Sequence, residues 1–198
     1  MISDIFKPAV VRVISPTARG LLRIGLTPNA VTTIGALGVI ATALFAYPRG
    51  HLFGGTVVIC ALALSDLFDG TMARLSQQGP SRWGGFLDST IDRVTDSAIA
   101  FGLLIYLARD NNSLSYVLIV SIVSGFLVSY IRAKAESLQI ECKGGFAERT
   151  ERLIILLTAI GLTGLGVDYI LTAGIWALAV ASVATVLQRL HIVWKATK

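Results

Sequence analysis

Four aspartates stand out in the sequence because they lie within or beside strongly apolar segments. Asp66 and Asp69 are three residues apart, and Asp88 and Asp92 are four apart. Residues at these spacings share one face of a helix. Two such helices packed together would gather four carboxylates, which repel one another and are costly to desolvate in an apolar bundle. The pattern therefore predicts a bound cation, and oxygen ligands favour a hard divalent ion such as Mg²⁺ or Mn²⁺.

Other functions for parts of this stretch have to be weighed. A single aspartate in a membrane helix can be a hydrogen-bonding partner in helix packing, and Asp66 could cap a helix. Gly70 either leaves room for a ligand to approach the backbone or lets two helices pack closely. Arg74 follows one turn later on the same face, where its guanidinium could bind a phosphate. Four acids at helical spacing together with these residues favour a metal and phosphate site.

The composition predicts a membrane protein. Of the 198 residues, 54% are apolar and 15% are charged, and the mean hydropathy is +0.73. A soluble domain of this length has no need of so many apolar runs. Runs close to the length that a bilayer requires occupy residues 29–48, 55–75, 85–108, 113–135, 151–167 and 170–190. We therefore predict an all-α membrane protein with six transmembrane helices.

The first residues predict a segment that lies along the membrane. Residues 2–14 place apolar side chains on one side of a helix and polar ones on the other. This pattern suits an amphipathic helix in the membrane interface, although an ordinary packing helix would also have it. Thr27 followed by Pro28 is typical of a helix start. We predict one membrane domain over residues 1–198, with a juxtamembrane segment at 1–26 and a six-helix bundle at 27–198.

The lysines and arginines predict the orientation of the chain. With the N-terminus inside, the basic residues on the cytoplasmic side are Lys7, Arg12, Arg19, Arg23, Arg74, Arg82, Arg93, Arg132, Lys134, Lys143, Arg149, Arg152, Arg189, Lys195 and Lys198. Only Arg49 and Arg109 fall on the opposite side. The positive-inside rule then puts both termini and the acidic cluster in the cytoplasm, where nucleotides are available. Basic residues at the inner leaflet account for the net charge of +5 without a nucleic-acid partner.

Three arginines mark the cytoplasmic ends of the last three predicted spans. Arg132 ends the fourth span, Arg152 begins the fifth and Arg189 closes the sixth. Three guanidiniums that converge on one cavity would bind a phosphomonoester or another anion. The same arginines can instead be topology determinants and interfacial anchors, and the residues alone leave both interpretations open.

The aspartates belong to a longer pattern of fixed identities. The pattern is Asp66-x-x-Asp69-Gly70-x-x-Ala73-Arg74, nine residues, then Gly84-x-x-x-Asp88-x-x-x-Asp92. It resembles the signature of the CDP-alcohol phosphotransferases, with a spacer one residue longer than usual. Further stretches resemble the actinobacterial phosphatidylinositol-phosphate synthases of that family, at residues 18–23, 25–28, 144–146, 151–155 and 188–191. Many members have Lys-Ala-Arg where this chain has Arg132-Ala133-Lys134.

The resemblance implies an activity and a metal site. The chain would be a homodimer in the cell membrane that transfers the phosphatidyl group of CDP-diacylglycerol to 1D-myo-inositol 3-phosphate, giving phosphatidylinositol phosphate and CMP. Asp66, Asp69 and Asp88 would hold one Mg²⁺, with Mn²⁺ as a possible substitute. A second ion would be held by Asp66, Asp88 and Asp92, with Asp92 also acting as general base.

The resemblance also implies which residues contact the two substrates. The residues for CDP-diacylglycerol would be Asn29, Ala30, Val31, Thr32, Gly70, Ala73, Arg74 and Ser81. The residues for the acceptor phosphate would be Ser129, Arg132, Arg152 and Arg189.

Two other functions remain open from the sequence. A phosphatidylglycerophosphate-type synthase would use the same donor with glycerol 3-phosphate, which is also a phosphorylated acceptor. A divalent-cation transporter could also place an acidic cluster in a six-span bundle. A transporter should carry carboxylates across the whole bilayer, whereas the outer halves of the predicted spans are almost free of charge.

Overall fold

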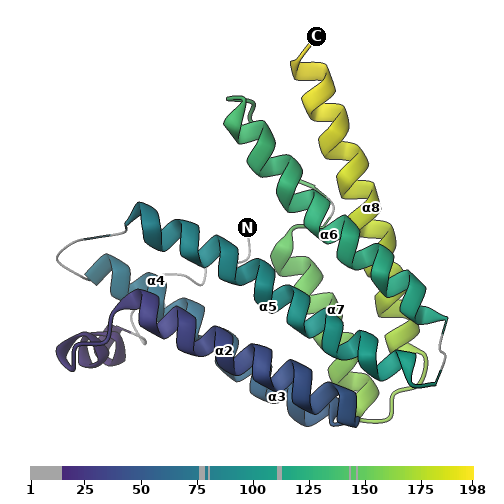
Figure 1. Cartoon of the computed structure of the whole chain (residues 1–198), viewed down its shortest axis with the longest axis horizontal. Coiled ribbons are helices and arrows are strands. Elements are labelled where there is room, and N and C mark those ends of the chain that lie inside the picture. Colours follow the sequence, from purple (N-terminus) through teal and green to yellow (C-terminus); the bar gives the residue numbers. More distant parts are fainter. Residues whose placement is uncertain (1–14, 76–78, 80, 111–112, 143, 146) are drawn as a thin grey trace. The chain divides into compact units, whose positions relative to one another are not determined.

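The structure, a computed structural model, describes residues 15–198 apart from 76–78, 80, 111–112, 143 and 146, and the side chains of 65–67 and 69 are also outside the description. The described chain is helical and has no strand (Figure 1). A helix over residues 15–23 comes first. It is followed by α2 (Pro28–Ala46), the 3-10 helix η1 (Tyr47–Arg49), α3 (Leu52–Ala63), α4 (Ser65–Leu75), α5 (Arg82–Ala108), α6 (Leu114–Ser137), α7 (Arg149–Gly164) and α8 (Ile170–Ala196).

The all-α prediction is confirmed for the described residues, and the six-span prediction is supported in part. Three segments are long and apolar enough to cross a membrane, namely Pro28–Arg49, Leu114–Ser137 and Ile170–Ala196. Helix α3 is apolar but has only 12 residues, and α7 has 16, so both are shorter than the roughly 20 residues that a membrane-spanning helix requires. Helix α5 has 27 residues, but its first half carries the charged side chains of the signature.

The segment at 55–75, predicted as one span, is divided into two helices. Helix α3 ends at Ala63 and α4 begins at Ser65. Serine is favoured where a helix starts, and a carboxylate in the first turn interacts favourably with the helix dipole. The break therefore places Asp66 in the first turn of α4.

The described residues form two compact units. The described residues within 15–43 and 57–99 form one unit, and those within 44–56 and 100–198 form the other. In the first unit α2 packs closely on α3, because a Cβ at Gly38 would lie 2.9 Å from Leu62 Cδ1. In the second unit α8 packs against both α6 and α7. Each unit has its own apolar core, with Met72 fully buried in the first and Ile160 in the second.

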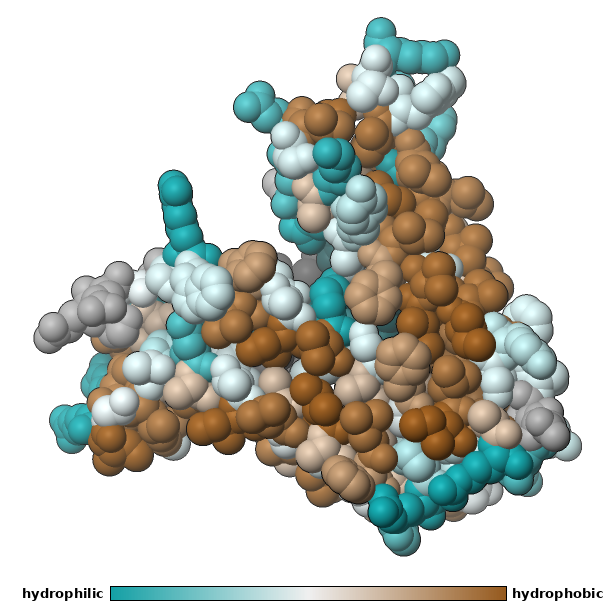
Figure 2. Space-filling view, in the orientation of Figure 1, coloured by the Kyte–Doolittle hydropathy of each residue, from teal (hydrophilic) through white to brown (hydrophobic). Residues whose placement is uncertain are grey.

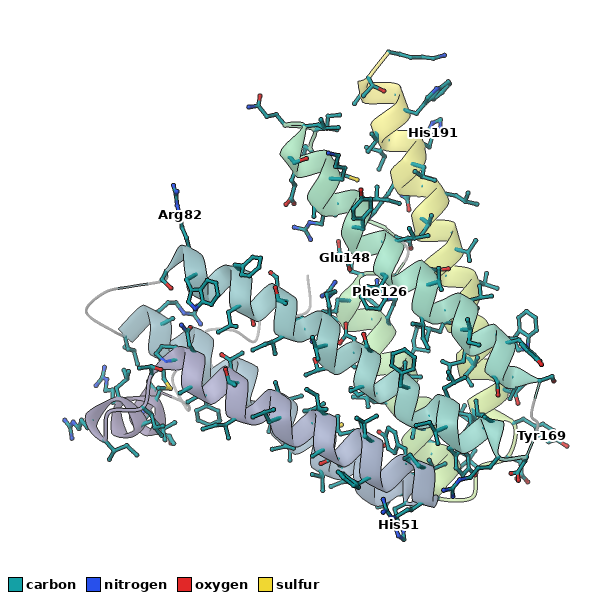
Figure 3. All side chains as sticks on the ribbon, in the orientation of Figure 1. His51, Arg82, Phe126, Glu148, Tyr169 and His191 are labelled. Carbon is teal, nitrogen blue, oxygen red and sulfur yellow. The ribbon has the colours of Figure 1, made fainter. Side chains whose placement is uncertain are left out.

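Apolar side chains also cover much of the outer surface. Exposed examples are Leu37 and Phe45 on α2, Val123 on α6 and Val180 on α8, and Figure 2 shows broad hydrophobic areas over the helices. Polar side chains lie at the helix ends, as the labelled residues Arg82 and His191 illustrate (Figure 3). A surface of this kind suits helices that contact lipid.

Helix packing in the second unit depends on glycines. A Cβ at Gly161 would lie 3.2 Å from Thr56 Cγ2, and the Thr56 hydroxyl is hydrogen-bonded to Tyr47 Oη at 2.9 Å. A Cβ at Gly164 would overlap the backbone nitrogen of Phe53. Small residues allow such close approach between membrane helices.

We predict that Gly164→Ala lowers the free energy of unfolding by about 1–3 kcal/mol, because the new methyl group meets backbone that cannot rotate away. The matched control is Gly54→Ala on α3, where a Cβ would have nothing within 4 Å among the described residues. Thermal unfolding of both variants in detergent tests this. Equal melting temperatures would contradict the packing argument.

Candidate functional site

A stripe of signature residues runs along the first half of α5. Gly84, Asp88 and Asp92 follow one another at intervals of four, so they share one helix face, as predicted. Asp88 is exposed, whereas the Asp92 side chain retains 16% of its accessible surface. The two carboxylates therefore differ in their access to water.

The other half of the predicted metal site is on α4. Asp66 and Asp69 belong to this helix, but their side chains are outside the described residues. Among the described side chains, no group of three or more acidic, histidine or cysteine residues is arranged to hold a metal. Asp66 and Asp69 are not among these side chains, so the four-carboxylate cluster stays a prediction.

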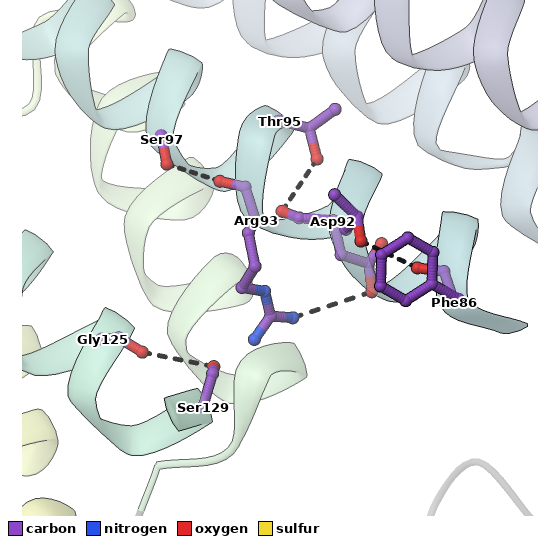
Figure 4. Close-up of polar contacts among 8 residues, drawn as sticks. Phe86, Asp92, Arg93, Thr95, Ser97, Gly125 and Ser129 are labelled. Carbon is purple, nitrogen blue, oxygen red and sulfur yellow. Dashed lines mark hydrogen bonds and ion pairs between the residues drawn. The ribbon is translucent and has the colours of Figure 1, made fainter. Parts of the chain in front are cut away.

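Asp92 lies beside a positive charge. Its Oδ2 is 3.7 Å from Nη2 of Arg93 (Figure 4). The backbone carbonyl of Asp92 accepts a hydrogen bond from Thr95 Oγ1 at 3.1 Å, and that of Arg93 accepts one from Ser97. From the sequence alone, Arg93 serves only to predict the orientation in the membrane, although its position directly after Asp92 indicates that it can pair with this carboxylate.

The starts of α2 and α5 meet at Gly84. The Gly84 amide donates a hydrogen bond to Ser81 Oγ at 2.9 Å, so Ser81 caps α5. A Cβ at Gly84 would lie 3.0 Å from Ser81 Oγ and 3.2 Å from Asn29 Oδ1. The structure therefore brings together Asn29 and Ser81, two predicted donor-binding residues that are far apart in sequence, and it does so beside a signature glycine.

The first turn of α2 holds the remaining predicted residues of that segment. Thr27 is confirmed as the cap, since its Oγ1 accepts a hydrogen bond from the Ala30 amide at 3.2 Å. Ala30 and Val31 are half-buried and Thr32 is buried. The Thr32 hydroxyl donates to the Pro28 carbonyl at 3.1 Å, within its own helix.

We predict that Ser81→Ala destabilises the protein by about 0.5–2 kcal/mol, because the variant loses the cap of α5. Ser81→Asn should retain most of the stability. The control is Ser89→Ala, an exposed serine in the interior of the same helix, where alanine is the better helix former. Thermal unfolding measures all three variants, and an unchanged melting temperature for Ser81→Ala would refute the cap.

Helix α4 presents one open face and one buried face. Met72 and Thr71 are buried, whereas Ala73 is half-buried and Arg74 is exposed. The Arg74 Nε donates a hydrogen bond to the Gly70 carbonyl at 3.0 Å, so the side chain lies back along its helix. A Cβ at Gly70 would meet nothing described within 4 Å. Glycine and arginine therefore share an accessible face.

Arg189 is the most enclosed of the predicted anion-binding residues. It is 2% exposed, and its Nη1 donates to the Val128 carbonyl at 2.6 Å. Its Nε and Nη2 both donate to the Gly144 carbonyl, at 3.2 Å and 3.1 Å. Much of its hydrogen-bonding capacity is therefore used to join α8 to α6 and to the loop before α7.

Arg152 and Ser129 lie near the same part of α6. The Arg152 Nη1 donates to the Ala147 carbonyl at 3.0 Å, and a Cβ at Gly125 would lie 3.7 Å from Arg152 Nε. The Ser129 hydroxyl donates to the Gly125 carbonyl at 3.3 Å (Figure 4). Arg152 is half-buried, so its guanidinium is held but accessible.

Arg132 behaves differently from these residues. It is exposed, and its Nε donates to Glu136 Oε1 at 2.9 Å one turn along α6. Surface pairs of this kind contribute little stability and exchange readily. The structure thus places contacts of Ser129, Arg152 and Arg189 at residues 125–129 of α6, and it turns Arg132 toward a neighbouring acid.

Thr185 is a second residue that the sequence reasoning did not single out. It is fully buried on α8, and its Oγ1 accepts a hydrogen bond from the Ala147 amide at 3.0 Å. The usable signal was its position four residues before Arg189, which puts both residues on one helix face.

Comparison with known proteins identifies relatives that cover most of the chain. The profile of the CDP-alcohol phosphatidyltransferase family matches residues 25–188. A phosphatidylinositol phosphate synthase from Streptomyces avermitilis is 47% identical over 188 residues, which are 90% of this chain and 76% of that protein. The crystal structure of the Mycobacterium tuberculosis phosphatidylinositol phosphate synthase with CDP-DAG bound has 44% identity and a TM-score of 0.88, over 92% of this chain and 94% of that one. A second crystal structure of that synthase, in complex with manganese and citrate, has 44% identity and a TM-score of 0.87, over 91% and 88%.

Proposed function

This chain belongs to the CDP-alcohol phosphatidyltransferase family, and from that premise we propose that it transfers a phosphatidyl group from CDP-diacylglycerol to 1D-myo-inositol 3-phosphate. The products are phosphatidylinositol phosphate and CMP. The observation that carries the proposal is the stripe of Gly84, Asp88 and Asp92 on one face of α5, which completes the family signature. The names of the relatives from Streptomyces avermitilis and Mycobacterium tuberculosis support the choice of acceptor.

In this proposal the nucleotide end of CDP-diacylglycerol binds at the starts of α2 and α5. Asn29 and Ser81 flank Gly84, and the lack of a side chain on Gly84 lets the polar atoms of both residues lie against the start of α5. Arg74 is exposed and uses its Nε to bind the Gly70 carbonyl. Its two Nη atoms would donate hydrogen bonds to the pyrophosphate, beside the open face at Gly70. The small or short side chains in contact with the donor would be Ala30, Val31, Thr32 and Ala73.

The residues present fit divalent cations. Carboxylates on α4 and α5 are the hard oxygen ligands that Mg²⁺ and Mn²⁺ prefer, and Asp88 is exposed. We assign Asp66, Asp69 and Asp88 to one ion and Asp66, Asp88 and Asp92 to a second. When bound, such ions supply positive charge that offsets the charge of the pyrophosphate and of the departing CMP. The manganese complex of the Mycobacterium tuberculosis relative supports the use of a divalent cation.

Asp92 is the general base in the proposed reaction. Its carboxylate takes the proton of the attacking inositol hydroxyl. The oxygen of that hydroxyl forms a bond to the phosphorus of the phosphatidyl group, and the bond from this phosphorus to the CMP oxygen breaks with its electron pair. Coordination lowers the basicity of a carboxylate, so we expect Asp92 to bind its ion more weakly than Asp88 does.

The acceptor phosphate binds to the basic residues of the second unit in this proposal. Arg152 and Ser129 would contact it directly, and Arg132 would exchange its surface partner Glu136 for the phosphate. Arg189 is buried and bonded to backbone carbonyls, so it would contribute positive charge from behind the site.

We further propose a homodimer in the plasma membrane, built from one membrane domain per chain. Both termini and the active site would be cytoplasmic, since 15 of the 17 lysines and arginines would then lie on that side. The three long apolar helices support the membrane location.

A CMP-release assay with purified enzyme and CDP-diacylglycerol tests the proposal. The acceptors are 1D-myo-inositol 3-phosphate, free inositol and glycerol 3-phosphate, and we expect turnover with the first alone. Preference for glycerol 3-phosphate would instead identify a phosphatidylglycerophosphate-type synthase. Metal flux into liposomes without CMP release would identify a transporter.

A further inference from the structure

The loop between α6 and α7 is fastened to α8 at three points. The Gly144 carbonyl accepts hydrogen bonds from Arg189. Gly145 packs against Thr185, where a Cβ would come within 2.5 Å of Thr185 Cγ2. The Ala147 amide donates to Thr185 Oγ1 at 3.0 Å, and both Ala147 and Thr185 are fully buried. The loop is therefore held from one side by two consecutive turns of α8.

The geometry of the Thr185 hydroxyl fixes its role. Its Oγ1 lies 2.7 Å from the Ala181 carbonyl, to which it donates its hydrogen atom. Only the lone pairs of the oxygen remain, so the hydroxyl must act as the acceptor for Ala147. A methyl group in its place would leave a buried amide without a partner, and this is costly.

Ala147 connects Thr185 to Arg152. Its amide is bound by Thr185, and its carbonyl accepts a hydrogen bond from Arg152 Nη1 at 3.0 Å. An arginine side chain has many conformations, and losing that freedom is unfavourable unless fixed partners select one of them. A fixed carbonyl at Ala147 is such a partner.

We propose that Thr185 is a positioning residue for the acceptor site: by holding Ala147, it orients the guanidinium of Arg152. The inference rests on the proposed function, since it assigns Arg152 to the acceptor phosphate. Gly145 contributes by its backbone, because its φ of +148° brings the loop against Thr185 in a conformation that other residues rarely adopt.

The main test is Thr185→Val, which keeps the side-chain shape and removes the acceptor oxygen. We expect the KM for inositol phosphate to rise about three- to tenfold, as the loss of one buried hydrogen bond suggests, while the KM for CDP-diacylglycerol stays unchanged. Thr185→Ser restores the hydroxyl and should restore the acceptor KM. Ser182→Ala is the matched control, because Ser182 is also fully buried on α8 and its hydroxyl has no partner among the described residues.

A double-mutant cycle with Arg152→Ala separates positioning from general stability. If Thr185 acts through Arg152, then Thr185→Val should raise the acceptor KM no further in the Arg152→Ala background. If the increases in acceptor KM caused by Thr185→Val and Arg152→Ala multiply in the double variant, the positioning role is overturned while the acceptor site stays intact. An equal rise in KM for both substrates in Thr185→Val would have the same consequence. An unchanged acceptor KM in Arg152→Ala alone would overturn the acceptor site and the inference together. If Thr185→Val folds poorly, Gly145→Ala takes its place in the cycle, because the new methyl group would meet Thr185 Cγ2 and push the loop away from α8.

Discussion

Replacing Asp92 by asparagine should abolish phosphatidyl transfer while CDP-diacylglycerol binding persists. The amide has nearly the shape of the carboxylate, but it cannot take the proton of the acceptor hydroxyl. General base catalysis contributes roughly 10²- to 10⁴-fold, and the loss of a metal ligand would add to this deficit. The donor contacts proposed on α2 and α4 remain in place, so binding should weaken only modestly. CMP release and equilibrium binding of the liponucleotide in the presence of Mg²⁺ measure the two effects separately.

A suitable control is Asp168→Asn, which makes the same chemical change at an exposed position outside the proposed site. Its turnover should match that of the unmodified chain. Turnover near the normal rate in Asp92→Asn would remove Asp92 from the role of base. Loss of donor binding in proportion to activity would indicate a role in metal or nucleotide binding alone.

The positions of the helices could be predicted well from hydropathy, and their ends less well. A sliding average detects apolar runs, but it passes over the break at Leu64, where Ser65 starts a new helix in the middle of one run. Helix α8 continues to Ala196, beyond the end predicted at residue 190. Gln188, Arg189, His191 and Lys195 lower the mean hydropathy around this end, but glutamine, arginine and lysine are good helix formers, so the helix can continue.

In the candidate site, too, the features set by local helical spacing could be predicted, whereas those set by tertiary packing could not. The shared face of Asp88 and Asp92 follows from helical periodicity, and the pairing of Arg132 with Glu136 follows from their spacing of four residues. The burial of Arg189 could not be predicted in this way. Its carbonyl partners are 61 and 45 residues away in sequence, so only tertiary packing determines that this arginine is enclosed while Arg152 stays accessible.

Because Arg152 stays accessible while Arg189 is enclosed, a substitution at Arg152 should affect the binding of the acceptor specifically. Arg152→Ala should raise the KM for inositol phosphate by about ten- to a hundredfold, as expected for the loss of a charge-assisted hydrogen bond. The KM for CDP-diacylglycerol should change little, because the residues proposed to bind it lie on other helices. Steady-state kinetics with each substrate varied in turn gives both values.

Two further variants show whether charge alone accounts for the effect. Arg152→Lys keeps the positive charge but lacks the planar fork that can reach the Ala147 carbonyl and a phosphate together, so it should recover only part of the acceptor affinity. Arg109→Ala removes an exposed arginine outside the basic group and should leave both KM values unchanged. If Arg152→Ala raised the two KM values equally, Arg152 would be a structural residue. The acceptor phosphate would then have to bind elsewhere.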